Sequence, residues 1–129
     1  MDFIKVGSAC PKTKVADVIF NVENICSCIN DAYNKDVKFL VFPELSITSY
    51  TCADLFLTST LINKSIEGIK LVCENSINKD MLIAVGCPLV HNNVLYNAAF
   101  IIFEGKILGI VPKSYIPNYS EFYEKRWFT

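Results

Sequence analysis

The sequence predicts an α/β domain in which helices pack against a β-sheet. Short apolar runs alternate with segments of helical periodicity, and the last two runs are separated by a two-residue turn signal. The chain has 129 residues, 52% of them hydrophobic, which is enough for one compact core. The expected order is therefore β-α-β-α-β followed by a β-hairpin, all within a single domain or part of one.

The first half of the chain supplies two expected strands and one helix. Residues 3–9 are short and apolar enough for a strand. Between Asp17 and Asn34 apolar residues recur every three or four positions, which predicts a helix with one buried face and Asp17 as its N-cap. Residues 38–42, KFLVF, form an apolar run ended by Pro43, which is typical of a strand covered on both faces.

The second half repeats this alternation and then changes. Helical spacing from about Thr58 to Ile77 predicts a second helix, and residues 81–86 predict another buried strand. Residues 95–103 and 106–111 flank Glu104-Gly105, a connection suited to a tight hairpin. The hairpin adds antiparallel strands to a sheet that otherwise has helical crossovers.

Charge and hydropathy exclude several classes of function. The net charge is −1 and the 12 Lys and Arg residues are scattered, so neither a nucleic-acid surface nor an anionic-lipid surface is expected. No basic, apolar leader and no apolar run long enough for a membrane span is found, which favours a cytoplasmic protein that acts on small neutral or zwitterionic ligands.

The cysteines do not indicate a metal site. The six cysteines include no C-x-x-C pair, and Cys26 and Cys28 fall on different faces of the expected helix. The sole histidine, His91, lies in a polar turn. We expect reduced structural cysteines, with Cys10 and Cys87 buried before prolines, and no bound metal.

Two charged residues follow strand ends in a similar way. Glu44 and Lys113 each come directly after a proline that ends an apolar run. Side chains just past the carboxyl ends of strands are often functional in α/β sheets. The pair has two interpretations: a surface ion pair of little energetic value, or an acid–base pair in a cleft that assists a cysteine nucleophile.

Two long segments show a family resemblance that favours the second interpretation. Residues 42–56, FPELSITSYTCADLF, and 85–128, VGCPLVHNNVLYNAAFIIFEGKILGIVPKSYIPNYSEFYEKRWF, resemble the amino-terminal glutaminase domain of glutamine-dependent NAD synthetases. That domain belongs to the nitrilase, or carbon–nitrogen hydrolase, superfamily. The resemblance implies an αββα sandwich, with residues 1–129 as the N-terminal half of the glutaminase domain.

The same resemblance implies roles for individual residues. Glu44 of FPEL corresponds to the general base, and Lys113 of VPKSY corresponds to the lysine that stabilises the oxyanion. Tyr119 corresponds to a residue that contacts glutamine, and Phe122 is expected in the pocket wall or its gate. The nucleophilic cysteine of the family lies beyond Thr129, so this part alone is expected to be inactive.

Substrates and partners are implied in the same way. L-Glutamine is the expected substrate, and a synthetase domain of the same polypeptide would use the ammonia to convert deamido-NAD to NAD. No cofactor is expected within this chain, whose five glycines form no pyrophosphate-binding loop, whereas ATP and Mg²⁺ belong to the synthetase domain. Half of a sandwich would leave one apolar sheet face uncovered, which predicts a homo-oligomer.

Some positions depart from the family or leave alternatives open. Ser49 replaces the usual glycine of a T-G-Y turn, and Tyr50 is expected to be packing more than contact. Cys52 is expected to pack beside the site, and residues 124–126 are either a solvated charged face or part of the pocket. Another amidase of the superfamily and a non-catalytic scaffold are the competing functions.

Overall fold

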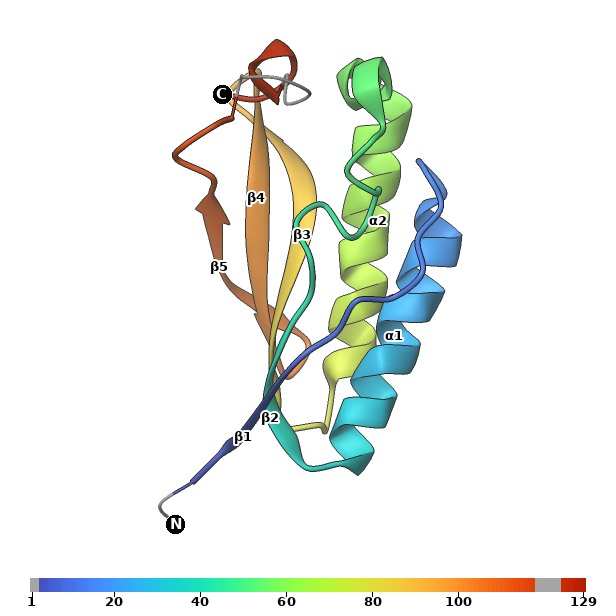
Figure 1. The fold of residues 1–129 in the computed structure, drawn as a ribbon, viewed down its shortest axis with the longest axis vertical. Helices are drawn as coiled ribbons and strands as arrows, with labels where there is room; N and C mark the ends of the chain where they lie inside the picture. Colours follow the sequence, from blue (N-terminus) through green and yellow to red (C-terminus); the bar gives the residue numbers. More distant parts are fainter. Residues whose placement is uncertain (1–2, 118–123) are drawn as a thin grey trace.

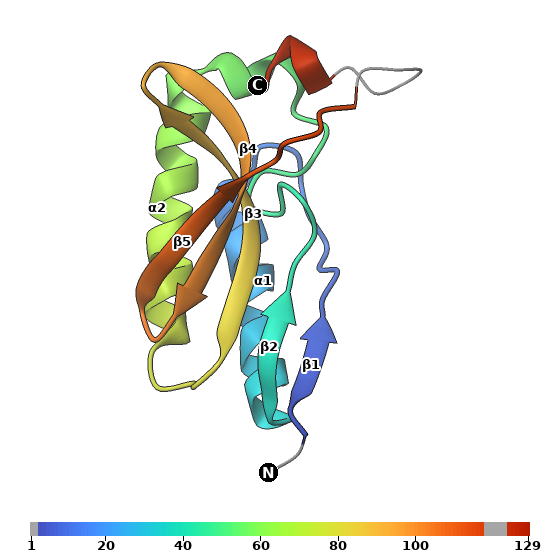
Figure 2. The same ribbon diagram turned by 90° about the vertical axis from the view of Figure 1, so that its left-hand side faces the viewer.

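One mixed β-sheet with two helices on one of its faces forms the domain. The computed structural model describes residues 3–117 and 124–129. Figures 1 and 2 show both long helices side by side on the same side of the sheet, and the two chain ends at opposite ends of the long axis. This is the α/β arrangement that the alternation of apolar segments predicts.

Strand order in the sheet follows the order in the chain, β1-β2-β3-β4-β5. The first three strands are parallel, and β4 and β5 are added antiparallel. The helical crossovers therefore produce the parallel part and the tight turns the antiparallel part, as expected. The strands are β1 (Lys5–Ser8), β2 (Val37–Val41), β3 (Leu82–His91), β4 (Val94–Phe103) and β5 (Lys106–Pro112).

The two long helices begin where the sequence predicts. The Asp17 carboxylate accepts a hydrogen bond from the Phe20 amide at 3.1 Å, and the Thr58 hydroxyl accepts one from the Leu61 amide at 3.3 Å. Such caps satisfy amides that have no partner inside a helix. The helices are α1 (Val18–Asn34), α2 (Ser59–Ser76) and the short 3₁₀ helices η1 (Ala53–Leu57) and η2 (Glu124–Arg126).

The core lies between the sheet and the helix pair. Ile83 and Val85 of β3 and Phe100 and Ile102 of β4 point toward the helices and are buried. Alternating residues of the same strands face the other way, because side chains in a strand alternate between faces. That second face is apolar and faces away from both helices (Figures 1 and 2). Its residues include Phe39, Val41, Ala84, Ala99, Ile101 and Val111.

The strand β3 is longer than the sequence prediction. We expected it to end at Gly86, but it continues through Pro88 to His91 and forms a second hairpin with β4. Pro88 is tolerated because β2 pairs with β3 only as far as Ala84, so the proline lies on a free edge. The turn residues Asn92 and Asn93 have φ values of 50° and 61°, the left-handed pair of a type I′ turn. At the start of the chain, β1 comprises Lys5–Ser8 and is therefore shorter than the expected strand of residues 3–9.

Aromatic residues directly after η2 contact η1. The rings of Phe56 and Phe128 meet edge to face with centroids 4.9 Å apart. The indole nitrogen of Trp127 donates a hydrogen bond to Asp54 at 2.9 Å. These contacts hold the segment after residue 123 against η1, and this segment includes Glu124.

Candidate active site

Strand directions bring Glu44 and Lys113 together. Because β4 is antiparallel to both its neighbours, β5 runs in the same direction as β2 and β3. The carboxyl ends of β2 and β5 therefore point the same way, and the strand pairing places both beside the middle of β3, which continues to His91. Glu44 lies just past β2, and Lys113 directly follows β5, where its amide donates a 2.7 Å hydrogen bond to the carbonyl of Asn97. Residues 69 positions apart thus become neighbours.

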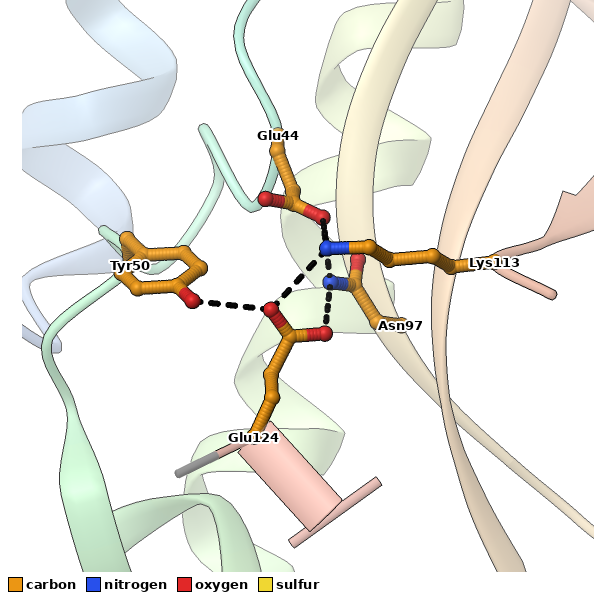
Figure 3. Close-up of polar contacts among 5 residues, drawn as sticks. All are labelled: Glu44, Tyr50, Asn97, Lys113 and Glu124. Atoms are coloured by element: carbon orange, nitrogen blue, oxygen red, sulfur yellow. Dashed lines mark hydrogen bonds and ion pairs between the residues drawn. The ribbon is translucent and has the colours of Figure 1, made fainter. Parts of the chain in front are cut away.

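The ammonium group of Lys113 contacts two carboxylates (Figure 3). Lys113 Nζ lies 2.5 Å from Glu44 Oε1 and 3.0 Å from Glu124 Oε1. The side chains of Glu44 and Lys113 are 39% and 28% exposed, whereas that of Glu124 is only 2% exposed. Burying a carboxylate is costly unless it is paired and hydrogen-bonded, and Lys113 is the cationic partner of Glu124.

Asn97 and Tyr50 complete the hydrogen bonds of the two carboxylates. The amide nitrogen of Asn97 donates to Glu44 Oε1 at 2.8 Å and to Glu124 Oε2 at 3.2 Å. The Tyr50 hydroxyl donates to Glu124 Oε1 at 2.8 Å. Glu124 therefore receives a donor on each oxygen, while the second oxygen of Glu44 points away from Lys113 (Figure 3).

The surroundings of Lys113 and Tyr50 raise the pKa values of both side chains. Burial lowers the pKa of Lys113, but its hydrogen bonds to Glu44 and Glu124 and their negative charges outweigh this and raise the pKa above 10.5. Burial raises the pKa of Tyr50, and the hydrogen bond to Glu124 raises it further. At neutral pH the site thus holds a charged lysine and a neutral phenol.

A hollow of about 310 Å³ adjoins the pair on the apolar face of the sheet. Its walls include Glu44, Lys113 and Asn97 together with small residues such as Gly86 and Ala99. An apolar hollow with a few convergent polar groups is typical of a small-molecule site. A base, a fixed cation and an amide at its rim are suited to chemistry on a carbonyl carbon.

The backbone around Glu44 has strained positions. Leu45, directly after Glu44, has φ 52°, and Ser49 has φ 76°. The resemblance implies a glycine at position 49, and the positive φ is consistent with this, because a residue with a Cβ costs roughly 1 kcal/mol there. Strained backbone is characteristic of functional turns.

The cysteines near the site are in structural positions. Cys52 is buried and its thiol donates to the Thr48 carbonyl at 3.0 Å; burial raises its pKa, so it is a thiol at neutral pH. Cys87 is fully buried on the helix side of the sheet, and burial raises its pKa too. Cys10 was expected to be buried, but it is exposed, since it lies in the loop after β1.

The structure corrects or extends several interpretations of the sequence. Tyr50 packs on the core as expected, but it also donates to Glu124. The solvated-face interpretation is wrong for Glu124, which η2 turns inward, and right for the exposed Lys125. Asn97 was not singled out, although it is the one amide in an otherwise apolar strand, which is the signal that could have revealed it.

Tyr119 and Phe122, the predicted substrate contacts, lie outside the described residues. Within residues 3–117 and 124–129, no three His, Cys, Asp or Glu side chains gather in a way that could hold a metal ion. Neither α1 nor α2, the long helices of the described part, is long and apolar enough to cross a membrane.

Comparison with known proteins places this geometry in a family. The model of the carbon-nitrogen hydrolase family matches residues 5–129. A glutamine-dependent NAD(+) synthetase of Mycobacterium tuberculosis is 32% identical over 124 residues, which are 96% of this chain and 18% of that protein. This chain therefore spans about a fifth of the length of such relatives.

Solved structures agree with the sequence comparison. The crystal structure of a glutamine-dependent NAD(+) synthetase from Cytophaga hutchinsonii matches with a TM-score of 0.93 and 33% identity, over 98% of this chain and 21% of that chain. A mutant of the amidase from Nesterenkonia sp. AN1 shares the fold, with a TM-score of 0.80 and 14% identity over 95% of this chain and 47% of that chain.

Proposed function

The chain belongs to the carbon-nitrogen hydrolase family, and from that premise we propose that it forms part of a site that hydrolyses the side-chain amide of L-glutamine. The contact between Glu44 and Lys113 at the rim of an apolar hollow is the main structural support. Similarity to glutamine-dependent NAD(+) synthetases favours glutamine over other amides.

In the proposed mechanism the nucleophile is a cysteine outside residues 1–129. The Nesterenkonia amidase has a covalent adduct at its active-site cysteine, which supports such a group for this fold. Glu44 takes the proton of the thiol as the sulfur attacks the amide carbon, and then gives this proton to the departing ammonia. Glu44 next takes a proton from water, whose oxygen attacks the thioester carbon, and gives this proton to the departing cysteine sulfur, which releases glutamate and restores the thiol.

Lys113 has the complementary role in this scheme. Its ammonium group is held by two carboxylates beside the hollow, and in this scheme the carbonyl oxygen of a bound amide becomes negative next to it. A preorganised cation stabilises that oxyanion without having to reorient during the reaction. Glu124 and Asn97 do not react in this scheme; they hold Lys113 and Glu44 in position.

We further propose that the ammonia serves ATP-dependent amidation of deamido-NAD in a synthetase domain of the same polypeptide. The site does not suit the phosphates of ATP, because its lysine is already paired with two carboxylates, which would repel them. ATP and Mg²⁺ would be held by the synthetase domain, where ATP would activate the carboxyl group of deamido-NAD.

Ammonia release from glutamine by the complete polypeptide that contains residues 1–129 tests the proposal. Glu44→Gln and Lys113→Met should each lower kcat by about 10²-fold to 10⁴-fold, as expected for loss of a base or an oxyanion donor. Glu104→Gln is the matched control, because Glu104 is a turn glutamate that accepts backbone hydrogen bonds from Asn78 and Asp80.

The possible results separate the competing functions. Unchanged ammonia release in Glu44→Gln would contradict the assignment of the base. Hydrolysis of another small amide but not of glutamine would identify a different amidase of the family. No turnover of any amide would favour a non-catalytic scaffold.

A further inference from the structure

Gly86 lies directly against the turn that holds Glu44. A Cβ atom at Gly86 would be 2.2 Å from the Leu45 amide nitrogen, 2.8 Å from the Pro43 carbonyl oxygen and 2.9 Å from the Glu44 carbonyl carbon. Distances under 3.0 Å do not occur for real Cβ atoms. The backbone before, at and after Glu44 therefore occupies the space that a side chain at position 86 would need.

Hydrogen bonds attach the same turn to β3. The Phe42 amide donates to the Ala84 carbonyl at 2.9 Å, continuing the parallel ladder past the end of β2. The next carbonyl on that edge, that of Gly86, accepts at 3.1 Å from Ile47. In a regular parallel ladder Glu44 would occupy that place. The chain thus leaves the ladder after Phe42 and returns at Ile47, with Glu44 in the excursion.

A third bond closes the attachment from the side of β3. The Gly86 amide donates to the hydroxyl of Ser46 at 3.3 Å, within the same excursion. The amide of Gly86 thus donates to Ser46 and its carbonyl accepts from Ile47, while its Cα, which carries no side chain, lies against the backbone of residues 43–45.

We propose that Gly86 is a positioning residue for Glu44: the absence of a side chain at this position sets how far the Glu44 turn lies from β3, and so where the carboxylate meets Lys113. This inference rests on the proposed function, in which Glu44 is the general base. A displacement of about 1 Å in such a site lowers the rate by about 10²-fold.

Two other glycines of the chain provide matched controls. A Cβ at Gly68 would be 2.8 Å from Val18 Cγ1, which is also too close, but the crowded atoms are side-chain methyls between the two helices. A Cβ at Gly109 would meet nothing within 4 Å. Gly86 differs from both because the three atoms nearest to such a Cβ all belong to the backbone of residues 43–45, which cannot move aside without moving Glu44.

The rate at which Lys113 is acetylated reports the position of Glu44, and its measurement does not require glutamine hydrolysis. Acetic anhydride acetylates only unprotonated amines, and the contacts of Lys113 with Glu44 and Glu124 keep it protonated. Loss of one nearby opposite charge lowers a lysine pKa by about one unit, so the acetylation rate should rise about 10-fold. Competitive acetylation of this chain, with each lysine quantified by mass spectrometry, measures that rate.

The expected pattern distinguishes positioning from general packing. Gly86→Ala should raise the acetylation rate of Lys113 by up to about 10-fold relative to the exposed Lys5, the limit reached if Glu44 no longer contacts Lys113. Gly68→Ala should lower the melting temperature without changing that rate, and Gly109→Ala should change neither. A folded Gly86→Ala protein with an unchanged rate at Lys113 would overturn the inference.

Ser46→Ala provides a second variant if Gly86→Ala does not fold. It removes only the hydroxyl that accepts from Gly86, so a smaller rise in acetylation at Lys113 is expected, and no rise would count against the inference. In the complete polypeptide, Gly86→Ala should lower kcat about 10²-fold with little change in KM. A changed acetylation rate in a protein without glutamine hydrolysis would refute the proposed function but not the positioning.

Discussion

Glu44 and Glu104 are both turn glutamates that accept hydrogen bonds, but they differ in how their donors are divided between the two carboxylate oxygens. Glu104, in the β4–β5 turn, uses one oxygen for the amide of Asn78 at 2.8 Å and the other for the amide of Asp80 at 2.7 Å. Glu44 receives its donors, from Lys113 and Asn97, on a single oxygen. Each oxygen of Glu104 thus accepts from a backbone amide, whereas one oxygen of Glu44 is directed away from Lys113 and Asn97 (Figure 3).

The difference separates a structural carboxylate from one available for chemistry. Glu104 joins the β4–β5 turn to the loop between α2 and β3, and its partners are amides that cannot release a proton. The partners of Glu44 are side chains that the fold brings from β4 and from just beyond β5.

Replacing Lys113 should have the largest effect on stability. Lys113→Met leaves Glu124 buried without its cation, and we expect the free energy of unfolding to fall by roughly 2 to 3 kcal/mol. Loss of a buried partner commonly costs more, but Tyr50 and Asn97 still donate to Glu124. Urea denaturation followed by circular dichroism measures the change.

A second substitution tests the cause. Glu124→Gln in the Lys113→Met background removes the uncompensated charge, so part of the lost stability should return. If the double variant is as unstable as the two single changes added together, Lys113 and Glu124 are not coupled.

The same ion pairs predict how stability depends on alkaline pH. The pKa of Lys113 is raised above 10.5 in the folded chain, so its contribution is fully present below about 10.5 and is lost as the pH rises through the folded value. The stability difference between the parent chain and Lys113→Met should thus be constant near neutral pH and shrink in strong alkali. Both proteins should carry Tyr50→Phe, so that the phenol does not titrate. A difference that grows with pH would contradict the assignment.

Replacing the structural glutamate should cost less and leave the site intact. Glu104→Ala removes the acceptor for two backbone amides, which should lower the free energy of unfolding by about 1 to 2 kcal/mol. Urea denaturation measures this loss, and the acetylation rate of Lys113 should not change. A faster rate would mean that the two ends of the sheet are coupled.

The smallest effect is expected at the phenol. Tyr50→Phe keeps the ring on the core and removes one donor to Glu124, whose Oε1 still receives Lys113 at 3.0 Å. The free energy of unfolding should fall by about 1 kcal/mol or less. A loss comparable to that of Lys113→Met would show that the hydroxyl, and not the ammonium, is the main partner of Glu124.

Most of the fold was predictable from local patterns. Both long helices begin where helical spacing predicts, the first with Asp17 as its expected N-cap, and strands alternate with helices before a final hairpin, as expected. The extension of β3 was missed because Pro88 suggests a break in a strand, and only the sheet shows that its edge is free there. Proline position depends on the neighbouring strand, which a single segment does not reveal.

The site was predictable only in part, for a similar reason. Glu44 and Lys113 each follow a strand end, a local signal, and the sheet brings them together; their catalytic roles remain proposals. The burial of Glu124 depends on Trp127 and Phe128 reaching back to η1, and three helical residues have no periodicity to predict that. Asn97 stands out in the sequence as the one amide of β4, but its role depends on two carboxylates that are distant in the chain and converge on it.

Because sheet order equals chain order, every strand after the first pairs with the strand synthesised immediately before it. A ribosome therefore releases each strand when its neighbour is already available, and no strand has to be inserted between two that have paired. Glu44 emerges early and stays without its cation until β4 and β5 have been added and Lys113 follows. The ion pair thus forms only after the strands that lie between its two residues in the chain have been made.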